Sequence, residues 1–89
     1  MLDKMSFVVS VIYKKENGEP VWLYLSIIDK GGDHLLCWTA YEDQAKTFNS
    51  TKAARDFFNK HRETLLAKGG FDMKTLGIRK RIYKLVENL

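Results

Sequence analysis

The feature that most constrains the fold is an Asn-Gly turn signal between two runs of strand-forming residues. Residues 6–15 (SFVVSVIYKK) and 21–29 (VWLYLSIID) are rich in β-branched and aromatic side chains. Asn17-Gly18 lies between them and favours the type I′ turn of a tight hairpin, because both residues readily adopt positive φ. Pro20 has no N–H to donate, so it is expected at the start of the second strand. The pattern predicts an antiparallel hairpin.

Further turn signals divide the rest of the chain. Gly31-Gly32 precedes residues 34–39 (HLLCWT), which we expect to form a third strand and complete a β-meander. Residues 42–48 carry apolar side chains at helical spacing, which predicts a short helical turn. Ser50 is placed to cap a principal helix over residues 51–68, and Gly69-Gly70 is expected to end it. The stripe that this helix is expected to bury consists of Ala54, Phe57, Phe58, His61 and Leu65.

The last segment, residues 71–89, fits two structures. Leu76, Ile78, Ile82 and Val86 keep the even spacing of a strand, but several of these residues also fit an amphipathic helix. Gly77, the two isoleucines and Tyr83 are mediocre helix formers, so we favour a strand through about Leu85.

The chain length and these elements together define an expected fold class. A chain of 89 residues is long enough for one domain and too short for two. Residues 1–89 are therefore expected to form a single α+β domain. It should contain a three- to four-stranded, mainly antiparallel sheet with an N-terminal β-meander, one principal helix packed on one face, and a short helical turn.

Cysteine content and hydropathy indicate a cytoplasmic protein. Cys37 is the one cysteine, so no internal disulfide can form, and a secreted domain of this size usually needs disulfides. The N-terminal residues show no signal-peptide pattern. The longest mainly apolar stretch, residues 21–28, is too short to span a bilayer, and no membrane association is expected.

Positive charge is concentrated near the C-terminus. The net charge is +4, and five bases but only two acids follow residue 70. The run of residues 78–84 interleaves cations with an aromatic ring, which suits contact with a nucleic acid or another anionic partner. The candidate contact residues are Arg79, Lys80, Arg81, Tyr83 and Lys84. The alternative is an edge strand kept soluble by its charge, which we favour because four cations are few for nucleic-acid affinity.

No residue pattern demands catalysis, a metal or a cofactor. His34, Cys37 and His61 are the residues that could ligate a metal or act as a nucleophile pair, and no CxxC or HxxxH spacing exists. His34 and Cys37 are expected on opposite faces of one strand, which disfavours a shared site. We expect no catalytic, metal or cofactor residues and no small-molecule ligand. A minor enzyme built on Cys37 and a histidine stays as a disfavoured alternative.

Three aromatic residues are candidates for a protein interface. Both faces of residues 21–29 are apolar, and about one full-length helix is available to cover them. If one face stayed uncovered, Trp22, Tyr24 and Trp38 would form an aromatic patch suited to a protein partner or a homodimer.

The middle of the chain resembles a kind of small phage protein. Trp38-Thr39, Ala45-Lys46-x-Phe48 and Ser50-x-x-x-Ala54 occur in that order. In this respect residues 22–61 are similar to small α+β proteins of unknown function encoded by phages and prophages of Gram-positive bacteria. The resemblance implies a phage origin and a binding role, since phages encode many small proteins that bind and divert other machinery. We therefore expect a non-enzymatic protein-binding or accessory protein, with a nucleic-acid-binding module as the alternative.

Overall fold

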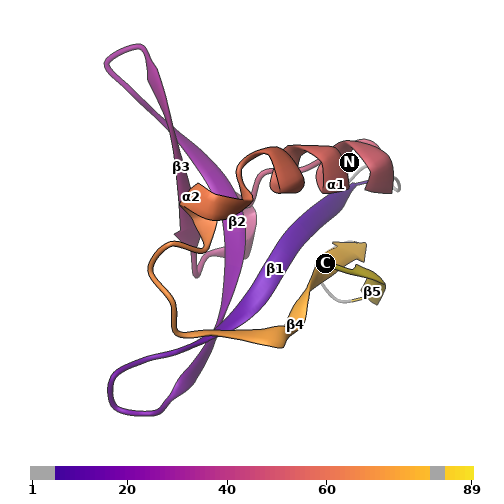
Figure 1. Ribbon diagram of the computed structural model, residues 1–89. Coiled ribbons are helices and arrows are strands. Elements are labelled where there is room, and N and C mark those ends of the chain that lie inside the picture. Colours follow the sequence, from indigo (N-terminus) through magenta and orange to yellow (C-terminus); the bar gives the residue numbers. More distant parts are fainter. Residues whose placement is uncertain (1–5, 81–83) are drawn as a thin grey trace.

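The computed structural model describes residues 6–80 and 84–89 and places five antiparallel strands in one sheet (Figure 1). The strands are β1 (Phe7–Lys14), β2 (Pro20–Lys30), β3 (Asp33–Thr39), β4 (Phe71–Lys80) and β5 (Lys84–Asn88), and their order in the sheet is β3-β2-β1-β4-β5. The helical elements are η1 (Glu42–Gln44), a 3₁₀ turn, and the helices α1 (Thr51–Lys60) and α2 (Arg62–Leu65). Both α1 and α2 lie on one side of the sheet, which we call the helix face.

The expected α+β fold with three to four strands is wrong. The protein is mostly sheet: it has five strands, about 21% of it is helical, and in the described ranges only α1 reaches seven residues. The N-terminal meander of β1, β2 and β3 is confirmed, together with the positions of both of its turns. The first turn is not the expected two-residue type I′ turn: the Lys15 N–H donates to the Glu19 carbonyl and the Gly18 N–H to the Lys15 carbonyl, so residues 16–18 form a three-residue loop. The error therefore lies in the C-terminal half, where residues expected to form helix or a single strand behave differently.

A bulge in β4 breaks the alternation of side chains by which the strand could have been recognised in the sequence. The segment after residue 70 forms two strands, β4 and β5, where one strand through about Leu85 was expected. Phe71 and Ile78 both pack on the core, although a strict alternation would send an odd and an even residue to opposite faces. The register of β4 against β1 shifts between them. Thr75 holds the bulge, since its Oγ1 accepts from the Ile12 N–H at 2.8 Å and donates to the Asp72 carbonyl at 2.7 Å.

The principal helix expected over residues 51–68 is divided in two. Ser50 caps α1 as expected, and its Oγ accepts from the Ala53 N–H at 3.0 Å. The helix stops at His61, whose φ of −112° and ψ of 14° are not helical, and α2 adds one turn. This break lets Leu65, which is 5% exposed, enter the core. A continuous helix was expected because helical periodicity in the sequence continues across His61.

β2 is shared between two neighbours. Its residues 20–24 pair with β1, whereas residues 24–30 pair with β3. Where β2 leaves β1, Phe48 exchanges two backbone hydrogen bonds with Phe7, at 3.0 and 2.8 Å, and the Lys46 N–H donates to the Leu25 carbonyl at 2.8 Å. Residues 45–48, expected to be helical, are thus extended and fill this gap. The β2–β3 hairpin projects from the sheet as an arm (Figure 1), here called the β2–β3 arm.

The core lies between the helix face of the sheet and the two helices. Phe58 of α1 is fully buried against the centre of the sheet, as is Ala54 one turn earlier. Burial of these apolar side chains supplies most of the driving force for folding. The buried cluster consists of Phe7, Val9, Val11, Leu25, Phe48, Ala54, Phe58, Leu65, Leu76 and Ile78.

β5 is held by an unusually close approach to β4. A Cβ added to Gly77 would lie 2.6 Å from Leu85 Cδ1 and 2.8 Å from the Glu87 carbonyl oxygen. Arg55 of α1 donates to both carboxylate oxygens of Glu87, at 3.0 and 3.1 Å, and so ties the helix to the same strand. Glycine at position 77 is therefore required by packing and not by its φ angle.

The variant Gly77→Ala tests this close approach. The added methyl group would displace the Glu87 carbonyl, so we expect the free energy of unfolding to fall by about 1–3 kcal/mol. Urea denaturation followed by circular dichroism measures the change. Met73→Ala, at a position on β4 that is 47% exposed, is the control and should change the free energy by less than about 0.5 kcal/mol. Equal stabilities of the two variants would contradict the interpretation.

Candidate functional site

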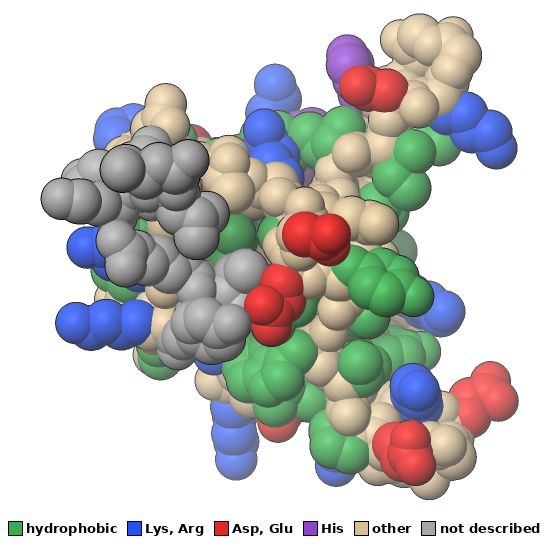
Figure 2. Space-filling model, turned by 180° about the vertical axis from the view of Figure 1, so that it is seen from behind, with side chains coloured by type: hydrophobic (Ala, Val, Ile, Leu, Met, Phe, Trp, Pro, Cys, Tyr) green, Lys and Arg blue, Asp and Glu red, His purple; other side chains and the backbone are tan. Residues whose placement is uncertain are grey.

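The face of the sheet opposite the helices, here called the second face, is partly covered by the chain itself. Val8 and Ser10 of β1 and Tyr24 and Ser26 of β2 point to this face and are buried. Ser26 Oγ donates to the Gln44 carbonyl at 2.6 Å, which places η1 against this face. Figure 2 shows hydrophobic side chains on this side of the molecule with acidic side chains among them. The surface left for a partner is therefore smaller than the sheet itself.

Arg79 is a structural residue at the centre of the second face. It is only 8% exposed, and its Nη1 donates to Ser10 Oγ at 2.7 Å and to the Thr75 carbonyl at 3.0 Å. Its guanidinium carbon lies 4.4 Å from the centre of the Trp22 ring, a cation–π contact. Burial lowers the pKa of Arg79 from its ordinary value, and Tyr24 acts in the opposite direction. Among the described residues, no carboxylate forms an ion pair with it.

The basic run proposed for an anionic partner is divided by the fold. Arg79 points into the second face, so its side chain is withdrawn from any phosphate. Lys80 is half-buried and stands directly opposite the exposed Lys84 in the β4–β5 ladder. Arg81 and Tyr83 lie outside the described residues. Of the five candidate contacts, the described part of the chain therefore brings together only Lys80 and Lys84.

The three aromatic candidates for a protein interface lie on different faces. Trp22 and Tyr24 belong to the second face, where Tyr24 is buried and Trp22 is 39% exposed beneath the Arg79 side chain. Trp38 lies on the helix face, and its Nε1–H donates to the Leu65 carbonyl at 2.9 Å. Its ring is 5.5 Å from that of Phe71. The structure therefore does not bring these three residues into one patch.

The residues weighed for metal or nucleophilic chemistry are also separated. Cys37 pairs with Ser26 on the second face, while the His61 ring packs at a tilt against Phe57 on the helix face, 4.7 Å between ring centres. His34 forms an exposed pair with Asp29 near the tip of the β2–β3 arm. In residues 6–80 and 84–89, no three His, Cys, Asp or Glu side chains are grouped as metal ligands.

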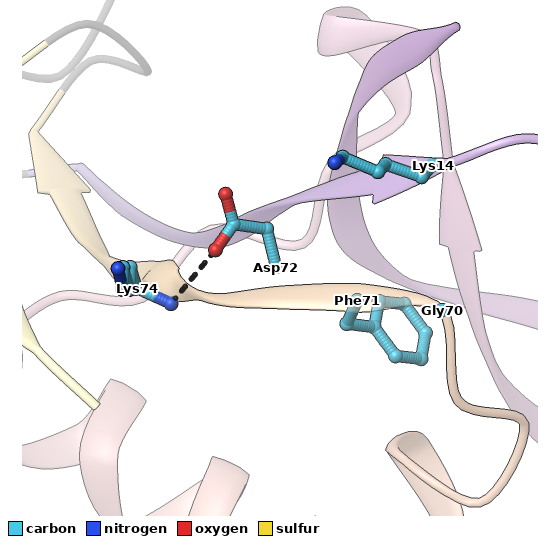
Figure 3. Close-up of a pocket in the computed structure, with 5 residues that line it drawn as sticks. All are labelled: Lys14, Gly70, Phe71, Asp72 and Lys74. Atoms are coloured by element: carbon cyan, nitrogen blue, oxygen red, sulfur yellow. Dashed lines mark hydrogen bonds between the residues drawn. The ribbon is translucent and has the colours of Figure 1, made fainter. Parts of the chain in front are cut away.

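A shallow cavity of about 420 Å³ lies where β1 ends and β4 begins (Figure 3). Lys14 reaches it from β1, and Gly70, Phe71, Asp72 and Lys74 line it from the other side. An Asp72 carboxylate oxygen accepts from the Lys74 backbone N–H at 3.1 Å, so this carboxylate already serves the local turn. The charged groups of this open cavity are the ammonium groups of Lys14 and Lys74 and the hydrogen-bonded carboxylate of Asp72. This set provides neither a nucleophile nor a metal site.

The most distinctive surface is the outer side of β3, which we call the β3 edge (residues 34–38). β3 is the terminal strand of the sheet, and within the described residues no backbone hydrogen bond reaches its outer side. Edge strands are commonly protected by lysine, proline or a bulge, and residues 35–38 contain none of these. Leu35 is 48% exposed, and its cross-strand neighbour Ile28 is 51% exposed.

Sequence analysis missed the β3 edge, although part of its signal was visible. The uncharged run Leu35–Leu36–Cys37–Trp38 follows the Gly31-Gly32 turn directly. That run reads equally well as a central strand, and only the strand order β3-β2-β1-β4-β5 puts it at the margin of the sheet.

Comparisons with known proteins give no family for this chain. No protein-family model matches it, and neither the curated proteins nor the solved structures contain a match. Among the helices of the described ranges, none combines the length and apolar character needed to cross a membrane.

The variant Arg79→Lys tests the structural role of this arginine. A lysine cannot keep the guanidinium's contact with the Trp22 ring together with the bonds to Ser10 and Thr75, so the free energy of unfolding should fall by about 1–3 kcal/mol. Lys84→Ala, at an exposed position on β5, is the control and should cost less than about 0.5 kcal/mol. Guanidinium titration measures both. A stability of Arg79→Lys equal to that of the control would refute the structural role.

Proposed function

We propose that this chain is a non-enzymatic binding protein that recognises an extended protein segment by adding it to the sheet at the β3 edge. Binding of this kind draws its affinity from backbone hydrogen bonds, and its specificity from side chains that alternate across the strand. The free thiol of Cys37 is typical of a reducing compartment, so we place this activity in the cytoplasm.

The observation that carries the proposal is the combination of a free backbone edge with an exposed apolar pair. An unprotected edge is a known template for strand pairing and hence a liability unless a partner covers it. Leu35 and Ile28 supply adjoining apolar surface on the second face, so a strand added there would shield apolar area as well as pair its backbone.

The opposite edge of the sheet lacks these properties. β5 is shorter, with five residues, and it includes Lys84 and Glu87. Arg55 forms an ion pair with Glu87 on the helix face, and the close contact at Gly77 fixes β5 to β4. The two edges therefore form a natural comparison within one molecule, because each carries a half-exposed leucine: Leu35 at 48% and Leu85 at 46%.

Site-specific photocrosslinking tests the proposed surface. A photoreactive phenylalanine analogue placed at position 35 in the producing cell should form discrete covalent adducts with protein after illumination. The same analogue at position 85 is the matched control, since the two leucines are equally exposed, and it should give at most about one tenth of the adduct yield. Mass spectrometry of the adducts identifies the crosslinked segment.

Two results would count against the proposal. One is an absence of adducts at position 35, and the other is an equal pattern of adducts at positions 35 and 85. A third variant, Leu35→Lys, should remain folded because the position is half-exposed, and it should abolish the adducts formed by an analogue at the neighbouring position 28. Retention of those adducts would show that the β3 edge is not the binding surface.

A further inference from the structure

The turn of the β2–β3 arm determines which backbone groups of β3 face outward. Gly31 and Gly32 form a two-residue turn with φ of 59° and 89°, and Lys30 pairs with Asp33 beside it. In a hairpin of this type, the pair next to the turn is hydrogen-bonded, and such pairs then alternate along the ladder. His34, Leu36 and Trp38 therefore direct their N–H and C=O groups away from β2.

A second contact supports this assignment independently. The Leu25 carbonyl accepts from the Lys46 N–H, so it points away from β3. Leu25 is the cross-strand partner of Trp38. In a pair that does not exchange hydrogen bonds, both residues point their backbone groups outward on opposite sides. Trp38 must therefore present its groups at the β3 edge, in agreement with the count from the turn.

These outward groups are symmetric about Leu36. If an identical β3 strand runs antiparallel to the first with a two-fold axis at Leu36, His34 of each copy faces Trp38 of the other. Leu36 faces itself. All three outward residues of each strand are then paired, which gives about six backbone hydrogen bonds. A register centred on Leu35 or on Cys37 pairs fewer of these groups within β3.

The side chains also suit this register. Leu35 of one copy stands opposite Cys37 of the other on the second face, and Asp33 stands opposite the uncharged Thr39. No charged residue therefore faces a like charge within the paired strands. Burial of Leu35 at the junction also removes half-exposed apolar surface that is next to Ile28 of the same copy.

Charge outside the strands does not oppose this register. On the helix face, α2 lies beside Trp38 through the bond to Leu65. This helix carries one base, Arg62, and one acid, Glu63, whereas the hairpin tip, residues 29–34, carries two acids and one base. The paired strands therefore bring a neutral helix, and not a like charge, toward the tip of the other copy.

We propose that a second copy of this chain occupies the β3 edge, related by a two-fold axis at Leu36, so that two five-stranded sheets join into one continuous sheet. The inference rests on the β3 edge being the recognition surface proposed above, and it names the occupant. An isologous contact of this kind closes on itself, so assembly stops at the dimer.

A disulfide trap tests the register. In the proposed pair, positions 35 and 37 of opposite copies do not exchange hydrogen bonds, and their Cα atoms are about 4.5 Å apart, within disulfide range. Leu35→Cys should therefore form a covalent dimer through the native Cys37 under oxidised glutathione, which is reduced as the two thiols join. The yield should exceed that of Leu85→Cys at least about tenfold.

The wild-type chain reports the register in the same experiment. Two copies of Cys37 lie diagonally in the proposed pair, too far apart to bridge, so the wild type should stay uncrosslinked. Efficient crosslinking of the wild type through Cys37 would overturn the register, and equal crosslinking of Leu85→Cys would overturn the choice of edge.

Sedimentation equilibrium of the uncrosslinked protein tests the dimer itself. We expect a concentration-dependent dimer whose dissociation constant rises about tenfold or more in Leu35→Lys and is unchanged in Leu85→Lys. A monomer at all concentrations overturns this inference. A monomeric protein would still be consistent with the proposed function if photocrosslinking at position 35 captures a different protein. Failure of the dimer and failure of the proposed function are therefore distinguishable.

Discussion

β2 is longer than its neighbour β1, and this difference in length determines where the remaining elements of the sheet can pair. β2 has eleven residues and β1 has eight, and only residues 20–24 of β2 pair with β1. Beyond Tyr24 the strand no longer pairs with β1, and residues 45–48 fill the gap, where Phe48 pairs its backbone with that of Phe7. The second half of β2 then has β3 as its strand partner, which creates the projecting arm and its free edge.

Arg79 shows how the second face is completed without a second layer of helices. A buried guanidinium is costly to desolvate, and here neutral acceptors on Ser10 and Thr75 and the Trp22 ring offset that cost. The long side chain spans β4, β1 and β2, so one residue covers the centre of the face. This also explains why a basic run in the sequence does not become one basic surface.

The candidate recognition surface is a consequence of both features. Arg79 and η1 occupy the middle of the second face, and Arg79 lies over Trp22, so the most exposed apolar residues of β2 and β3 are those of the arm, Ile28 and Leu35. The backbone beside them is unpaired on its outer side within the described chain. Apolar surface and outward-facing backbone groups thus coincide on the β2–β3 arm, which projects from the rest of the sheet (Figure 1).

Local signals in the sequence determined the meander, the positions of both of its turns and the start of α1. Asn17-Gly18, Gly31-Gly32 and the Ser50 cap act within a few residues, so their structural effect can be recognised without knowing the rest of the fold. Tertiary structure decided the bulge at Thr75, the break at His61 and the marginal position of β3. Each of these depends on a partner distant in sequence: Ile12 for Thr75, the core for Leu65, and the strand order for β3. The burial of Arg79 and the exposure of Leu35 follow from such long-range pairing, because a side chain's surroundings are set by which strands lie beside it.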